Sequence, residues 1–167
     1  MIDMLGGSLA LPPAPIIYGG GLPLKEIFGL PVHPLVVHAV VVLVPLASLG
    51  LIMMASGIRR SKRYGGLVTL IAGIAAVSAF LAMASGRDLA ERFGYGAQEH
   101  FAMGRWMPWV GLAVFANCLL LWLLDKKPSQ RNLPGKVLAI AGFVVAAAAI
   151  GATVYTGHLG AELVWGS

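Results

Sequence analysis

Four histidines are the residues of this sequence best suited to chemistry, and two of them stand in one short apolar stretch. The segment "VHPLVVHAVVVLVPLA" holds His33 and His38, while His100 and His158 follow in "QEHFAMGRW" and "VYTGHLGAELVW". A neutral imidazole offers a nitrogen lone pair to haem iron, zinc or copper, and it also exchanges protons near neutral pH. The positions of these four side chains decide which of these uses is open to them.

The apolar segments around the histidines predict an all-α fold, a four-helix transmembrane bundle. Hydrophobic residues make up 58% of the sequence and charged residues 11%, far below the roughly 25% charged residues of soluble proteins. The sequence lacks the alternating pattern that is typical of barrel strands. Each apolar run approaches the roughly 17–25 residues that cross a bilayer as a helix. We expect spans at about residues 34–57, 66–86, 107–124 and 137–157.

Basic residues predict the orientation of this bundle. Eight of the 12 Lys and Arg residues lie in two short connections, "IRRSKRYGG" and "DKKPSQRNLPGK". Such loops face the cytoplasm, so the sequence predicts a multi-pass membrane protein with both termini extracytoplasmic. Residues 1–32, broken by Pro and Gly, are expected to form an extracytoplasmic arm before a domain at 33–167. The net charge of +5 then reflects topology, which favours lipid and not nucleic acid as the partner.

In this orientation all four histidines lie near the outer ends of helices. His33 and His38 are about 140° apart around a helix and about 7 Å apart along it, so they do not share a face. Pro34 suits the first turn of a helix, which places His33 at the helix start and His38 inside the bundle, where it needs a partner. We expect His100 to be held above His38 by an outer connection made of two short amphipathic helices, residues 87–93 and 97–106.

Several interpretations of this histidine layer stay open. The histidines are structural residues without a cofactor, or two of them bind haem b, or three or four of them bind Zn or Cu. A proton-relay or quinone site is a further alternative. In the haem interpretation His38 and His100 are the metal ligands, and arginines of the same end meet the propionates. The cofactor-binding candidates are His38, His100, His33, His158, Arg87, Arg92 and Arg105.

Two further features bear on function and packing. The sequence has no phosphate-binding loop, serine elbow or His-Glu-x-x-His pair, so no catalytic residues and no enzyme activity are predicted. The second and fourth spans are rich in small residues, among them Gly73, Ala76, Gly142 and Ala146. Small residues let membrane helices approach closely, which predicts that these two spans pack against each other.

Three segments carry a resemblance to a known family. "GLPVHPLVVHAVVVLVPLA", "QEHFAMGRWMPW" and "TGHLGAELVW" resemble the four-span bacterial membrane proteins of domain of unknown function 2231, in its actinobacterial form. The likeness covers roughly residues 29–166, and the His-Pro-x-x-x-His block is its most specific part. His33, His38 and His100 match the family's histidines, whereas His158 matches those of only some members.

The resemblance implies a protein of the bacterial plasma (inner) membrane with a place in electron transport. Some relatives are joined to, or lie near, redox domains of the Rieske and cytochrome kind. The chain is then either a haem b electron-transfer or redox protein linked to the respiratory chain, or a non-catalytic accessory subunit of a larger respiratory membrane complex with structural histidines.

Overall fold

Helices make up nearly all of the part of the chain that the structure describes. The computed structural model describes residues 26–27, 30–93, 98–128 and 130–165, with side chains from residue 32 onward except 87–98, 163 and 164. The helices are α1 (Val32–Ala55), α2 (Ile58–Phe93), α3 (Gln98–Gly104), α4 (Met107–Asp125) and α5 (Leu133–Trp165). A short antiparallel pair, β1 (Glu26–Ile27) and β2 (Leu30–Pro31), precedes α1.

Four of these helices are long and apolar enough to cross a membrane. The four candidate spans are Val32–Ala55, Ile58–Gly86, Glu99–Asp125 and Leu133–Glu162. The third span takes α3 and α4 together. Large apolar side chains such as Val42, Leu67 and Ile140 are exposed on the outside of the bundle, where lipid replaces water. The prediction of an all-helical protein with four spans is confirmed, and the protein contacts the lipid bilayer. The helices α1, α2 and α5 begin two, eight and four residues before their predicted spans, and α4 begins at Met107, the predicted start.

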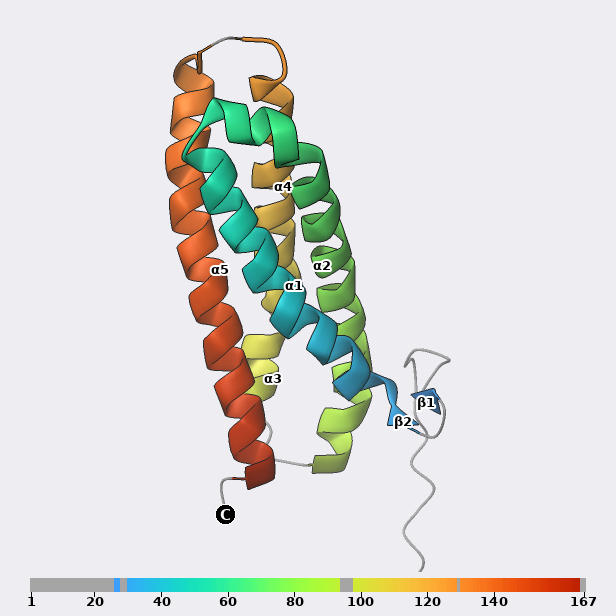
Figure 1. Cartoon of the computed structure of the whole chain (residues 1–167). Helices are drawn as coiled ribbons and strands as arrows, with labels where there is room; N and C mark the ends of the chain where they lie inside the picture. The colour runs from blue at the N-terminus through green and yellow to red at the C-terminus, as the bar shows by residue number, and fades with distance from the viewer. Residues whose placement is uncertain (1–25, 28–29, 94–97, 129, 166–167) are drawn as a thin grey trace, which may run out of the picture.

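The centre of the bundle is formed by α1 and α4. Fully buried side chains there include Val44 and Leu51 of α1 and Val114 and Leu121 of α4. Both α2 and α5 pack against α1 and against α4, but they share no extensive contact with each other. In Figure 1, α2 and α5 stand on opposite sides, with α1 in front of α4.

This arrangement corrects the prediction that the two small-residue helices pack together. Their small residues instead face the central helices: an ideal Cβ on Gly111 of α4 would lie 3.1 Å from Cα of Ala76 in α2, and one on Gly142 of α5 would lie 3.3 Å from Leu51 in α1. Close approach is therefore used between α2 and α4 and between α5 and α1.

The connection between the second and third spans also differs from the prediction. Residues 87–93 do not form a separate helix, because α2 continues through them to Phe93. The stretch "RDLAERF" contains mainly good helix formers and neither Gly nor Pro, so nothing in it ends the helix. The second predicted short helix corresponds to α3, whereas residues 94–97 and most of the predicted arm at 1–32 lie outside the described residues.

A buried ion pair closes the end of the bundle where α1 joins α2 and α4 joins α5. Asp125, the last residue of α4, has 1% of its side chain exposed and accepts a hydrogen bond from Arg131 at 2.8 Å. The same guanidinium donates to Met54 O at 2.5 Å and to Ala55 O. These carbonyls belong to the last turn of α1, where helix carbonyls lack regular partners. Arg131 therefore fastens α1, α4 and the loop before α5 together.

We predict that Arg131→Gln strongly destabilises the bundle. It leaves the Asp125 carboxylate buried without its partner, which costs roughly 3 kcal/mol or more in the free energy of unfolding. Unfolding by denaturant in mild detergent, followed by circular dichroism, measures the change. Lys127→Gln is the matched control, because Lys127 is exposed in the same loop and is expected to change the free energy by less than about 0.5 kcal/mol. Equal stability of the two variants would contradict the prediction.

Candidate functional site

His33 stands in the first turn of α1 and reaches across to α2. Its Nδ1 lies 2.9 Å from Ala82 O and 3.2 Å from Ser85 Oγ. A carbonyl oxygen can only accept, so Nδ1 is the protonated nitrogen and, in the neutral ring, Nε2 keeps its lone pair. Among the described residues, Nε2 of His33 has no hydrogen-bond partner. The ring is half-buried between the two helices.

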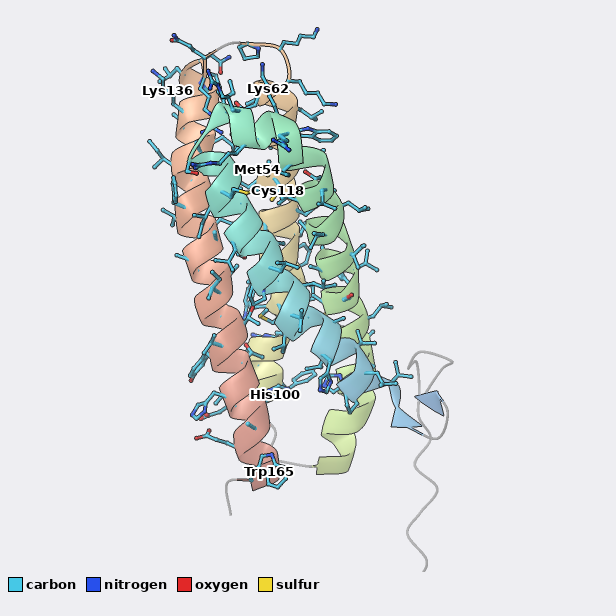
Figure 2. All side chains as sticks on the ribbon, in the orientation of Figure 1. Met54, Lys62, His100, Cys118, Lys136 and Trp165 are labelled. Carbon is cyan, nitrogen blue, oxygen red and sulfur yellow. The ribbon has the colours of Figure 1, made fainter. Side chains whose placement is uncertain are left out.

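His100 makes the same contact from another helix. It lies in α3, and its Nδ1 donates to Thr156 O of α5 at 3.1 Å. The bond again fixes the proton on Nδ1 and leaves the Nε2 lone pair available. Figure 2 shows His100 beside α5, at the end of the bundle remote from Lys62 and Lys136. We call this the histidine end: the start of α1, the end of α2, α3 and the end of α5.

Glycine explains how each ring reaches a helical carbonyl. Side chains of an α-helix tilt toward its N-terminus, so the side chain at position i+4 covers the carbonyl of residue i. Four residues after Ala82 stands Gly86, and four residues after Thr156 stands Gly160. An ideal Cβ would lie 2.8 Å from Cε1 of the ring held on α2, and 3.0 Å from Cε1 of the ring held on α5. We call Ala82–Gly86 and Thr156–Gly160 the two cradles.

The other two histidines are placed differently. The side chain of His38 is exposed, and its Nδ1 donates to Pro34 O of its own helix at 2.6 Å. The side chain of His158 is 65% exposed, and its Nε2 lies 3.2 Å from Oε1 of Glu162 one turn later. The two histidines of α1 do occupy different faces, but their expected roles are reversed. The helix begins at Val32, before His33, and it is His33 that faces the interior.

The arginines and metal ligands proposed from the sequence are only partly placed. Arg105 is exposed at the histidine end, with its guanidinium carbon 5.8 Å from the centre of the Trp106 ring. The side chains of Arg87 and Arg92 lie outside the described part. Within the described residues, no group of three or more His, Cys, Asp or Glu is gathered to hold a metal ion. A Zn or Cu site made of three or four histidines therefore has no assembled ligand set in this part of the chain.

His33 and His100 make the same kind of contact at the same end of the bundle, each through Nδ1 to a backbone carbonyl of an outer helix. A metal-bound histidine normally donates its second ring nitrogen to a carbonyl or carboxylate, which fixes the ring and raises its basicity. Both rings have that support already, and both keep the nitrogen that would bind. Sequence reasoning missed the supporting residues, although the repeated pattern in "GRDL" and "GAEL" marks both glycines.

Fold and site together define a four-helix integral membrane protein with two fixed histidines at one end. The chain matches, over residues 29–167, the model of a family described as "Predicted membrane protein (DUF2231)", and it belongs to that family. The match confirms the resemblance seen in the sequence for the family as a whole. No curated protein and no solved structure matches the chain.

We predict that His33 and His100 both hold their proton on Nδ1 in the protein without ligand. ¹⁵N NMR of the imidazole nitrogens, recorded about two pH units above the ordinary histidine pKa of about 6.5, reports the tautomer of each neutral ring. Single His→Gln variants assign the signals. His158, whose described contact is to Glu162 through Nε2, is the internal comparison. A proton found on Nε2 of either His33 or His100 would contradict the geometry.

Proposed function

We propose that this protein binds haem b at the histidine end, where His33 and His100 would hold it, and that it transfers electrons in a bacterial respiratory membrane. The observation that carries the proposal is the pair of cradles. Two imidazoles from different helices are each fixed through Nδ1 on a backbone carbonyl, and each keeps the Nε2 lone pair. Haem iron in b-type sites is held by such nitrogens, and second-shell bonds of this kind orient them.

The residues present fit this group. Haem would supply one-electron transfer at the site when bound. The chain's own contribution is to hold the two rings: Ala82 O and Thr156 O each accept a hydrogen bond from Nδ1–H and set the direction of the ring. Arg105 is an exposed cation at the same end, suited to a carboxylate at the water boundary. Arg87 and Arg92, which the sequence places in the last part of α2, complete the cations that we propose for this role.

The pair His33 and His100 is preferred to the pair His38 and His100. Only the first two rings bond to a helix other than their own, whereas the ring of His38 bonds to a carbonyl of its own helix. A histidine with a purely structural task, half-buried between helices, gains most when both ring nitrogens have partners. Each of these two rings instead has one bonded nitrogen and one nitrogen without a described partner.

A reduced-minus-oxidised optical spectrum tests the proposal. We expect an α band of the b type in protein purified in mild detergent, or after haemin is added to it. His33→Ala and His100→Ala are expected to abolish this band or reduce it at least about tenfold, in line with the loss of a metal ligand. His158→Ala is the matched control, because His158 is exposed at the same end, and it is expected to keep the wild-type band.

Two other outcomes would overturn the proposal. A band that is lost in His38→Ala and kept in His33→Ala would assign the ligand to the exposed histidine of α1. A flat spectrum after haemin addition, together with co-migration of the protein with other subunits after mild extraction of its membrane, would favour an accessory subunit of a respiratory complex with structural histidines.

A further inference from the structure

The buried positions of α2 and α5 repeat each other. Gly160 lies 74 positions after Gly86, and this same displacement relates the buried faces of the two helices. Every residue of α5 that the structure describes as buried, from Gly135 to Leu159, has a buried counterpart in α2. Ala72 and Ala75 of α2, for example, correspond to Ala146 and Ala149 of α5, with less than 2% exposed in all four.

The central helices repeat in the same way. A displacement of 70 positions carries Val44 and Leu51 of α1 to Val114 and Leu121 of α4, and all four are buried. This displacement is smaller than the 74 positions between α2 and α5. The second hairpin has the longer connection between its helices, the one that contains Arg131, so α5 is displaced further along the sequence than α4. The order of contacts is also the same: each outer helix packs on its own partner and on the central helix of the other pair. A two-fold axis between α1 and α4 would produce this pattern.

The cradles fall at equivalent places in the two halves. Ala82 and Thr156 are separated by the same 74 positions as the two glycines, and an acidic residue and Leu stand two and three positions after each glycine, in "GRDL" and "GAEL". The histidines themselves are 67 positions apart, because the first stands in α1 itself and the second in the separate helix α3. Two rings presented by different local structures thus meet equivalent carbonyl–glycine pairs.

We propose that the chain consists of two related hairpins, α1–α2 and α4–α5 with its leading α3, and that Gly86 and Gly160 are paired positioning residues that fix His33 and His100 for one shared ligand. This inference rests on the proposed function for the identity of the ligand. A site that offers one imidazole from each half suits a metal macrocycle, because histidine nitrogens would hold the iron of such a group.

Alanine substitutions of the glycines test the inference. A Cβ at Gly86 would lie 2.8 Å from Cε1 and 3.2 Å from Nδ1 of His33, and a Cβ at Gly160 would lie 3.0 and 3.2 Å from the same atoms of His100. Each ring must therefore move away from its carbonyl. Gly151→Ala in α5 is the matched control, because nothing lies within 4 Å of its Cβ position. Alanine favours a helix over glycine, so all three variants are expected to fold.

Two measurements separate this inference from the proposed function. In the protein without ligand, Gly86→Ala is expected to shift the ¹⁵N imidazole signals of His33 alone, and Gly160→Ala those of His100 alone. In haemin titrations followed at the Soret band, each variant is expected to bind about 10–100-fold more weakly, by a similar factor, as second-shell changes do. Gly151→Ala is expected to match wild type in both.

The outcomes are distinct. Unchanged imidazole signals in either glycine variant, or a loss of haemin affinity in only one of the two, would overturn the paired positioning role. If wild-type protein binds no haemin, the proposed function fails and the inference of a shared macrocycle site fails with it. The selective NMR shifts would still show in that case that both cradles hold their rings.

Discussion

The histidine end depends on a constraint that the bilayer imposes on every helix that crosses it. Backbone groups in lipid must find partners inside the protein, so each spanning segment is a helix whose carbonyls are bonded along its own axis. Such a carbonyl keeps a second lone pair, but the side chain four residues later normally covers it. Gly86 and Gly160 remove that cover at one position on α2 and one on α5, and a histidine ring from a neighbouring helix occupies each opening.

The two ends of the bundle use opposite solutions for their polar groups. At one end Asp125 and Arg131 form an ion pair, and Arg131 also donates hydrogen bonds to the last carbonyls of α1. Both charged groups therefore join parts of the fold. At the other end His33 and His100 use one ring nitrogen for attachment and keep the other. The first arrangement is that of a structural clamp. The second resembles the support that metal-binding histidines receive through their other ring nitrogen.

Much of this architecture could be predicted from the sequence, because span length and hydropathy follow directly from bilayer thickness. The number of spans could be predicted from the sequence alone, and the histidines could be chosen as candidate functional residues in the same way. The choice between His33 and His38 could not be made in this way. When nearly every residue of a helix is apolar, the sequence does not say which face is turned inward. For the same reason the small residues of α2 and α5 suggested a mutual contact, although both helices pack on α1 and α4.

The supporting residues were harder to foresee than the ligand candidates. A cradle consists of a backbone carbonyl and a glycine that leaves this carbonyl uncovered. Neither is a residue type that indicates a binding site in the sequence. The ion pair of Asp125 was likewise hidden, because Arg131 lies among seven other basic residues that mark topology. The short patterns "GRDL" and "GAEL" mark Gly86 and Gly160 in the sequence, but their equivalence becomes clear only from the repeat of α2 in α5, which is visible once burial is known.

The central claim is that His33 and His100 together hold one ligand through their Nε2 atoms. Electron paramagnetic resonance of the ferric, haemin-loaded protein tests it most directly, since the spin state reports the number of strong axial ligands. The account predicts a low-spin signal in wild type that becomes high-spin in His33→Ala and equally in His100→Ala. A high-spin signal in wild type, or a low-spin signal that survives either substitution, would contradict it.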